Sequence, residues 1–509
     1  MQENNKRIAK NTLMLYFRQI LILFVSFYTV RVVLNVLGIE DYGIYNVVGG
    51  IVTFFSFLSG SMASATQRFF SFALGQNNFE KLKTTFTINW LIYGAIALIA
   101  VILLETVGCW FVSKHLNIPL GRYEAVVCVY HFAVFSFVTS IMTSPFTAMI
   151  TAHEDMRIFA YVSIIEAIMK LSVVFLLQYL AGDKLEVYGI LLFAVSLINA
   201  IIYIAICMRK YQECQFRQFY WDNRLLREIV GFTTWTLFGQ VTSVARNQGI
   251  TILINQFFNP VVVAAKAIAS SITNQINLFS NNFNIGLYPP IIKSYAAGNK
   301  MEMFSLIFRG SKITFFLMWV FALPLFLEMD TILQVWLKNP PPGTILFTRL
   351  ALIEVLITSI SLPITTAARA PGKMKFYEFT LGCIQIAIFI VSWFVLVLGA
   401  AAYSVFIVAI VANLLMFLVR LLIVKQLIDI PLRNYYVRVV LPVSIIIFLS
   451  GVSSFAIHWL LPVGFVYACI SILMSILISS VSMYFVGLNI LEREKIRNVV
   501  MSRVTLKKK

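Results

Sequence analysis

Long apolar segments alternate with short polar ones along the whole of this 509-residue chain. A helix needs about 18 or more apolar residues to cross a bilayer, and about fourteen segments meet that length. Their approximate limits are 11–37, 43–74, 86–112, 122–150, 157–181, 187–208, 228–258, 262–287, 305–330, 343–366, 376–398, 401–425, 435–458 and 463–488. We predict a membrane-spanning helix in each, with ends placed to within about four residues.

The seventh and eighth segments depart from this pattern because polar side chains run through their middle. Those that we single out are Gln240, Arg246, Asn247, Asn274 and Asn277. An arginine at the centre of a membrane helix costs roughly 2.5–3.5 kcal/mol on insertion scales, so it normally faces water or a partner rather than lipid. The pattern predicts that these two spans line a polar, cationic cavity.

Composition excludes a soluble globular protein. Hydrophobic residues make up 60% of the chain and charged residues 12%, whereas soluble domains carry about 25% charged residues. The first apolar run, 12–37, is much longer than the core of a signal peptide, so we expect it to be retained as the first span. Six scattered cysteines without a CxxC pair, and only four histidines, give no pattern for a metal or haem site. We therefore expect no cofactor.

The net charge is +18, and the positions of the lysines and arginines indicate how the chain is oriented in the membrane. Most lysines and arginines lie at the N-terminus, in the even-numbered loops and in the tail, and few lie in the opposite loops. Those few are Lys114, Arg122, Lys184, Lys266, Lys338 and Arg349. Positive residues stay on the cytoplasmic side, so both termini are predicted to be cytoplasmic. Because the charges sit in short loops, the pattern does not favour nucleic-acid binding.

A smaller set of charged residues falls inside the spans: Arg18, Arg31, Arg68, Lys170, Arg246, Glu166 and Glu354. Glu166 and Lys170 have the spacing of neighbours on one helix face and are expected to neutralise each other. Glu354 has no evident partner in its own span. Arg246 either faces the cavity or pairs with a buried acid such as Glu354. For Arg31 and Arg68, anchoring at the membrane interface competes equally with a cavity role.

The chain also repeats itself. SFALGQNNFEKL (71–82) ends the second span and SYAAGNKMEMF (294–304) ends the eighth, with Gly75 and Gly298 offset by 223 residues. Two parallel halves related by a pseudo-two-fold axis fit the internal duplication of many transporters. The predicted parts are a six-helix bundle (1–208), a basic cytoplasmic linker (209–227), a second six-helix bundle (228–425), an extra helix pair (426–490) and a basic cytoplasmic tail (491–509).

Several features together carry a family resemblance. They are the six-plus-six-plus-two span order, the SFALGQ ending, LGIEDYGIYNV (37–47) between the first two spans, and the polar seventh and eighth spans. The chain resembles the O-antigen (Wzx-type) flippases, in the polysaccharide-transporter branch of the multidrug/oligosaccharidyl-lipid/polysaccharide (MOP) exporter superfamily. The resemblance implies an all-α polytopic protein of the bacterial inner membrane with a MATE-like fold and a central cavity. It also implies a transporter, not an enzyme, that moves an undecaprenyl-diphosphate-linked oligosaccharide to the periplasmic leaflet for O-antigen, capsule or exopolysaccharide.

The resemblance further implies candidate residues. Arg18, Arg31, Arg68 and Arg246 correspond in type and span to cationic cavity residues of related flippases. A planar guanidinium suits a diphosphate because it bonds two oxygens at once, and Gln240, Asn247, Asn274 and Asn277 offer partners for sugar hydroxyls. Glu166, Lys170 and Glu354 are candidates for coupling to H⁺ or Na⁺, with the membrane potential as a third driving force. Further expected partners are membrane lipids and the glycan polymerase machinery.

Three other functions compete. A cation-coupled multidrug exporter of the same fold should display unpaired carboxylates in its cavity, and this chain has an excess of positive charge there. A membrane enzyme such as a glycosyltransferase would need a carboxylate cluster or large catalytic loops. A scaffold without transport activity would tolerate the loss of its cavity arginines.

Overall fold

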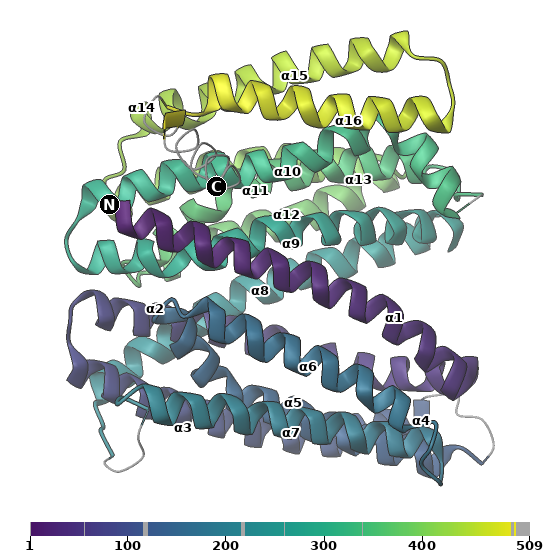
Figure 1. The fold of residues 1–509 in the computed structure, drawn as a ribbon, viewed down its shortest axis with the longest axis vertical. Helices are drawn as coiled ribbons and strands as arrows, with labels where there is room; N and C mark the ends of the chain where they lie inside the picture. The colour runs from purple at the N-terminus through teal and green to yellow at the C-terminus, as the bar shows by residue number, and fades with distance from the viewer. Residues whose placement is uncertain are drawn as a thin grey trace, which may run out of the picture. The chain divides into compact units, whose positions relative to one another are not determined.

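The computed structural model describes residues 2–54, 56–115, 121–214, 219–258, 260–337, 339–489 and 493–494. Within these ranges the side chains of residues 2–10, of some other positions before Leu58, and of residues 114, 115 and 260 are outside the description. The described chain is helical almost throughout (Figure 1). It divides into an N-terminal unit, residues 1–241 with 288–300, and a C-terminal unit, residues 242–287 with 301–509.

The N-terminal unit contains the first six predicted spans. Its helices are α1 (Gln2–Phe54), α2 (Ser56–Gly75), α3 (Phe79–Leu103), a π-helical turn (Leu104–Gly108), α4 (Cys109–His115), α5 (Tyr123–Ala152), α6 (Met156–Leu176) and α7 (Lys184–Lys210). The first and second predicted spans are separated by a break inside α1 at Gly38, where φ is +82°. Glycine tolerates this conformation because it has no Cβ. The second span therefore consists of the end of α1 together with α2.

Two long helices, α8 (Asn223–Phe257) and α9 (Pro260–Ala296), contribute to both units. The remaining helices are α10 (Lys300–Leu337), α11 (Thr344–Arg369), α12 (Lys375–Val397), α13 (Ser404–Ile428), α14 (Leu432–Tyr435) with a π-helical turn (Tyr436–Val440), α15 (Leu441–Leu460), and α16 (Phe465–Ser482) with a π-helical turn (Met483–Gly487). Ten helical segments of the described chain are long and apolar enough to cross a membrane, and α1, α2, α8 and α9 are not among them. The predicted all-α membrane fold is confirmed.

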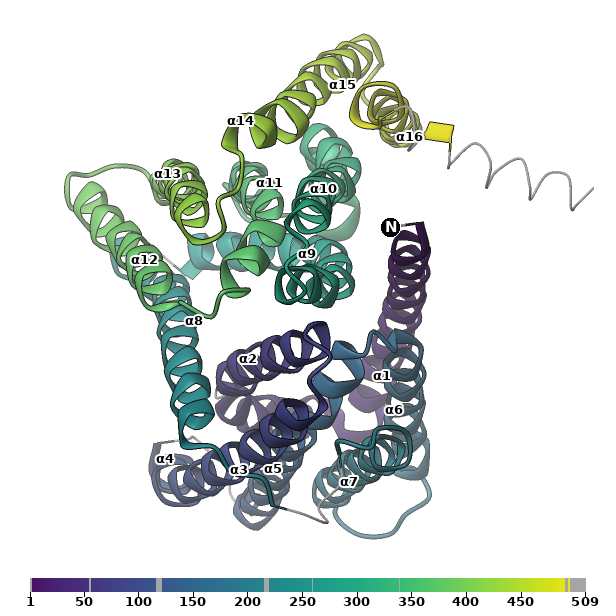
Figure 2. The same cartoon turned by 90° about the vertical axis from the view of Figure 1, so that its left-hand side faces the viewer.

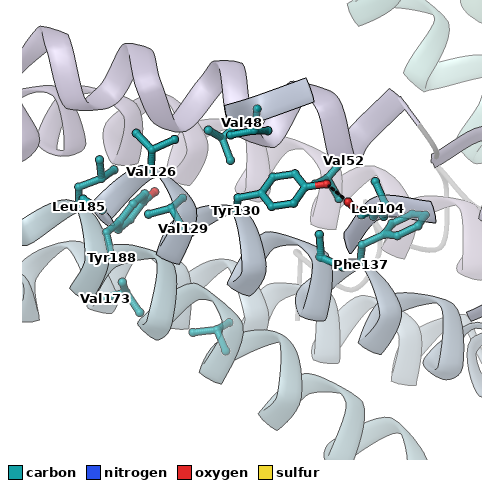
Figure 3. Close-up of a cluster of buried hydrophobic side chains, with 14 of the residues drawn as sticks. Val48, Val52, Leu104, Val126, Val129, Tyr130, Phe137, Val173, Leu185 and Tyr188 are labelled. Atoms are coloured by element: carbon teal, nitrogen blue, oxygen red, sulfur yellow. Dashed lines mark hydrogen bonds between the residues drawn. The ribbon is translucent and has the colours of Figure 1, made fainter. Parts of the chain in front are cut away.

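The apolar core of the N-terminal unit lies where α5 packs against α7, α3 and α1 (Figures 1 and 2). Its buried side chains include Val48, Val52, Val126, Val129, Tyr130 and Leu185 (Figure 3). The Tyr130 hydroxyl donates a hydrogen bond to the Leu104 carbonyl at 2.6 Å, so the ring is buried with its polar atom satisfied. In the C-terminal unit α11 packs against α13 in the same way.

The duplicated sequence forms the same backbone turn twice. After α2, Asn77 has φ +52° and the Asn78 N–H reaches back to the Ala73 carbonyl at 3.1 Å. After α9, Gly298 has φ +74° and the Asn299 N–H bonds the Ser294 carbonyl at 2.9 Å. Both are left-handed helix ends that satisfy otherwise free carbonyls.

These turns correct the predicted offset of the repeat. The residue equivalent to Gly298 is Asn77, an offset of 221 (77 to 298), and not Gly75. Aligning Gly75 with Gly298 gives an offset of 223, because the residue types alone do not show which residue adopts a positive φ. The turn after α5, at Glu154 (φ +64°), recurs after α11 at Gly372 (φ +80°). The predicted assignment of residues 1–208 and 228–425 to two six-helix bundles remains a prediction.

The last turns of α9 belong to the N-terminal unit because they pack on α2. A Cβ placed on Gly75 would lie 2.7 Å from the Lys293 Cα and 2.8 Å from the Ala296 Cβ. The Tyr288 hydroxyl donates to the Ser64 carbonyl at 3.3 Å. The two helices therefore meet closely at Gly75, where there is no room for a side chain.

A set of ion pairs fixes the loop between α5 and α6 to the end of α7. The His153 ring nitrogen lies 2.5 Å from the Glu213 carboxylate, and Asp155 accepts from Lys210 at 2.8 Å and from Tyr211 at 2.5 Å. Burial opposes ionisation of Glu213, but the hydrogen bonds from His153 and the backbone outweigh it, so the pKa of Glu213 lies below its ordinary value.

The extra helix pair is attached to α10 by polar contacts inside an apolar interface. The buried Lys312 ammonium donates to the Gly487 carbonyl at 2.8 Å, and the Trp319 indole N–H donates to the Ser450 hydroxyl at 2.9 Å. α15 and α16 lie side by side (Figure 2). Their other faces expose large apolar side chains, as expected of helices covered by lipid.

Candidate functional site

Arg246 and Glu354 form an ion pair inside the C-terminal unit. The Arg246 Nη1 atom on α8 lies 3.1 Å from the Glu354 Oε1 atom on α11. Asn413 on α13 donates to the same carboxylate oxygen at 3.0 Å. Because α11 and α13 pack against each other, they bring the acid and the amide together and present both to Arg246.

A second cation completes this group, which we name the Arg246 cluster: Arg246, Asn247, Thr251, Lys266, Glu354 and Asn413. The Arg246 Nη2 donates to the Asn247 Oδ1 at 2.9 Å. The Lys266 ammonium on α9 donates to the Thr251 hydroxyl at 2.5 Å and to the Asn247 carbonyl at 3.2 Å. The cluster contains two cations and one carboxylate, so it carries one excess positive charge when all three groups are ionised.

The cluster is partly buried, with 12% of the Arg246 side chain and 20% of the Glu354 side chain exposed. Charges interact more strongly there than in bulk water because the local dielectric constant is lower. Both ends of the guanidinium fork are engaged, Nη1 by Glu354 and Nη2 by Asn247. These two bonds use two of the five N–H donors of Arg246, so an anion can bind at the remaining donors or replace one of these partners.

Arg18 and Arg68 lie in the N-terminal unit, in aromatic surroundings. Arg18 on α1 is 9% exposed and its Cζ atom lies 4.8 Å above the Phe159 ring. Arg68 on α2 is 6% exposed. Its Cζ atom lies 4.6, 4.8 and 5.6 Å from the ring centroids of Phe69, Phe72 and Phe232. Cation–π contacts of this kind contribute about 0.5–2 kcal/mol each. The substrate roles of Arg18 and Arg68 remain predictions.

The other predicted ligands are distributed over both units. Gln240 is exposed on the part of α8 that belongs to the N-terminal unit. Asn274 and Asn277, exposed and half-buried, lie three residues apart on α9 and so share a face. Arg31 is in α1, and its side chain lies outside the described residues. The substrate roles of all these residues remain predictions.

Glu166 and Lys170 pair as predicted, at 2.6 Å along α6. The second carboxylate oxygen of Glu166 accepts from Asn199 on α7 at 2.9 Å. This carboxylate is therefore neutralised and bonded on both oxygens.

Sequence reasoning missed three members of the Arg246 cluster, Thr251, Lys266 and Asn413. Asn413 is a single amide in the middle of an otherwise apolar span, a signal that the sequence does contain. Lys266 was grouped with the outer-loop residues from its position near a span end. Its long side chain reaches the polar atoms of α8, a contact that charge counting cannot reveal.

Comparison with known proteins identifies both a family and a fold. A family model described as polysaccharide biosynthesis protein matches residues 8–294. An outward-facing multidrug resistance MATE family transporter of the MOP superfamily is 11% identical, with a TM-score of 0.73 over 84% of this chain and 96% of that chain. A MATE structure in a bent conformation is also 11% identical, with a TM-score of 0.72 over 83% and 96%.

A mutant form of a Vibrio cholerae MATE transporter is 15% identical, with a TM-score of 0.66 over 84% of this chain and 97% of that chain. No curated protein sequence matches the chain. At these identities the structures establish the fold alone, and that fold is the one predicted. The matched family region includes α8 and all but the last residues of α9, the polar helices of the candidate site.

Proposed function

The chain belongs to the polysaccharide biosynthesis protein family, and from this premise we propose that it is a flippase for a lipid-linked glycan precursor. Its substrate is an undecaprenyl-diphosphate-linked oligosaccharide, a repeat unit of O-antigen, capsule or exopolysaccharide. It moves this lipid from the cytoplasmic to the periplasmic leaflet by alternating access. Family and fold are those of membrane transporters, and the step requires relocation without covalent chemistry.

The excess positive charge of the Arg246 cluster is the observation that carries this proposal. A lipid diphosphate brings about two negative charges across roughly 30 Å of hydrocarbon, and a bare ion in a low dielectric costs tens of kcal/mol. Fixed cations within the membrane-spanning helices offset much of that cost. Arg246 offers a planar fork and Lys266 a compact charge, and phosphate accepts hydrogen bonds from both.

The pairing of Arg246 with Glu354 suggests how transport is coupled to protons. A phosphate that takes over the Arg246 guanidinium leaves the Glu354 carboxylate without its counter-charge, and a buried carboxylate then requires another cation. Asn413 still donates to Glu354 afterwards. We infer that substrate and proton exchange at Glu354, whereas Glu166 stays neutralised by Lys170. Na⁺ exchange and the membrane potential are the alternative driving forces.

The location proposed is the bacterial inner membrane, with both termini in the cytoplasm as the distribution of lysine and arginine predicts. Membrane lipids surround the protein, and the glycan polymerase machinery is its proposed partner. A cation-coupled multidrug exporter with this fold is the alternative. Its cationic substrates call for unpaired carboxylates, whereas Glu166 and Glu354 both have cationic partners.

The experiment is glycan export in a bacterium whose own flippase gene is deleted. The chain is compared with Arg246→Ala, Arg246→Lys and, as a control of equal charge change, Arg438→Ala, an exposed arginine outside the cluster. All are matched for membrane abundance. We expect the unmodified chain and Arg438→Ala to restore surface glycan, Arg246→Lys to restore part of it and Arg246→Ala none. Export by Arg246→Ala at the unmodified level would exclude Arg246 as a ligand. No export by the unmodified chain in several glycan backgrounds, together with drug efflux, would favour the exporter.

A further inference from the structure

The N-terminal unit contains a half-open cavity of about 640 Å³. It lies between α1, α2, α5, α6 and α7, all in the N-terminal unit, whereas the Arg246 cluster belongs to the C-terminal unit. Its volume falls in the range of small-molecule sites, about 300–1,000 Å³. Val129, Phe137 and Tyr188, which belong to the buried hydrophobic cluster drawn in Figure 3, also line this cavity.

Three helices line this cavity with polar residues at helical spacing. The α5 stripe is Ser136, Ser140, Thr143 and Thr147, the α6 stripe is Ser163, Glu166 and Lys170, and α7 adds Ser196 and Asn199. Residues at i, i+4, i+7 and i+11 share one face of a helix. The polar lining therefore lies on one face of each of the three helices.

Nine of the lining residues are serines or threonines. Six of these hydroxyls donate their hydrogen to a main-chain carbonyl, at 2.7–3.4 Å: Thr29, Ser136, Thr143, Thr147, Ser163 and Ser196. A hydroxyl that has given its hydrogen to the backbone keeps acceptor lone pairs on its oxygen. The wall is therefore rich in hydrogen-bond acceptors, which fits a ligand that brings many donors.

Among the described residues that line the cavity, the charges cancel. The charged side chains there are Glu166 and Lys170, paired at 2.6 Å, with Asn199 bonded to the second Glu166 oxygen at 2.9 Å. Arg18, whose Cζ atom lies 4.8 Å from the Phe159 ring centroid, is not among the lining residues. A charged ligand would lose its hydration without gaining a counter-charge, so the ligand should be uncharged.

Aromatic rings complete the wall. Tyr45 and Tyr188 meet edge to face with their centroids 5.0 Å apart, and both line the cavity together with Phe159 and Tyr203. Such rings offer flat apolar surfaces beside hydroxyl groups. A sugar ring has the matching chemistry, since it carries hydroxyl donors around its edge and apolar C–H groups on its faces.

We propose that this cavity binds an uncharged sugar unit of about one or two rings. If the proposed function is correct, the ligand is a neutral sugar of the transported glycan, held in the N-terminal unit while the diphosphate is held elsewhere. The binding itself can be measured without transport.

The test is thermal unfolding of the full-length protein in phosphatidylcholine nanodiscs, which contain no sugar detergent, with methyl α-glucoside or maltose as the probe. Sugars also stabilise proteins generally by exclusion from the surface. We therefore compare the unmodified protein with Ser196→Leu, which fills the cavity, and with Ser480→Leu, a control on an exposed helix face. Trimethylamine N-oxide serves as an osmolyte that is not a sugar.

We expect sugar to raise the unfolding midpoint of the unmodified protein and of Ser480→Leu in a saturable way. This rise should exceed the rise that sugar causes in Ser196→Leu by about 2 °C. The osmolyte should raise all three equally. Should Ser196→Leu fail to fold, the isosteric double variant Thr143→Val/Thr147→Val removes acceptors at constant volume and should lose the sugar effect. An equal rise in the filled or the isosteric variant would overturn the proposal. So would a midpoint that responds to NaCl against KCl but not to sugar, since that marks a cation site.

Failure of this inference is distinguishable from failure of the proposed function. Arg246→Ala should keep the sugar-dependent rise even where it abolishes export. A protein that binds sugar but exports no glycan in any background would retain the cavity assignment and lose the flippase assignment. A protein that exports glycan but shows no sugar-dependent rise would do the reverse.

Discussion

Breaking the contact between Arg246 and Glu354 gives a quantitative prediction. At the observed 3.1 Å, two unit charges attract by about 5 kcal/mol with an effective dielectric constant near 20. Dehydration of both groups consumes much of this energy, and removal of one partner of a fully buried pair costs about 3–5 kcal/mol. With 12% and 20% of the side chains exposed, the lower end of that range applies.

We expect Arg246→Met to lower the free energy of unfolding by about 3 kcal/mol because it leaves Glu354 charged with Asn413 alone. Glu354→Gln should cost less, about 2 kcal/mol, since its amide oxygen still accepts from Arg246 and Asn413. If the sites were independent the double variant would lose about 5 kcal/mol, whereas a paired arrangement predicts about 3 kcal/mol. The coupling energy is thus about 2 kcal/mol.

The measurement is reversible unfolding in mixed micelles of dodecyl sulfate and a mild detergent, followed by circular dichroism. A matched cycle on Glu166 and Lys170, whose side chains are 29% and 48% exposed, should give a coupling below about 1 kcal/mol. Additivity of the two Arg246-cluster substitutions to within about 0.5 kcal/mol would refute the pairing. Glycan export by the double variant distinguishes two roles of Arg246. If export recovers, Arg246 serves only to neutralise Glu354. If export is still lost, the substrate needs the arginine.

Three further predictions concern stability. Gly75→Leu should abolish the close approach of α2 and α9 and lower the free energy of unfolding by more than about 3 kcal/mol. Gly94→Ala, where a Cβ meets nothing within 4 Å, should be neutral or stabilising. Equal effects of the two substitutions would contradict the packing at Gly75. Lys312→Met should release the turn after α16 and increase proteolysis there, because the Gly487 carbonyl loses its charged donor. An unchanged rate of cleavage would show that this hydrogen bond does not stabilise the turn. The pKa of Glu213 is lowered in the folded protein, so its carboxylate contributes to the free energy of unfolding above its ordinary pKa of about 4.3, and this contribution is lost as the pH falls below that value. Glu213→Gln should therefore make the free energy of unfolding less dependent on pH in this range. An unchanged pH dependence would argue against the pair with His153.

The helices could be predicted from the sequence because a membrane span is defined by a long apolar run and needs no distant partner. Helix ends were placed well where a polar loop follows, as at 123 and 152 for α5. The break inside α1 at Gly38 and the equivalence of Asn77 with Gly298 depend on backbone dihedral angles, which letters encode poorly. Glycine adopts positive φ readily, but asparagine does so here as well.

The candidate site was predictable in composition but not in its contacts. Arg246 stands out because its charge is expensive in a membrane, and Glu354 was its one named alternative partner. Lys266 and Asn413 became visible only when four helices were brought together. The polar stripe of α5 was not predicted for a different reason. A serine or threonine whose hydroxyl bonds the carbonyl one turn earlier is tolerated within an apolar membrane span. Such residues leave an apolar span looking uninterrupted.

The repeated turns after α2 and α9 have a consequence for how the chain folds during its synthesis. In each turn the N–H groups of the three residues after the helix bond three of its last carbonyls, so these carbonyls need no partner from chain that has yet to be made. Each turn can therefore close as soon as its three residues have been synthesised. The duplication gives each half of the chain one such helix end, near residue 77 and near residue 298, whose backbone bonds form before the following span is made.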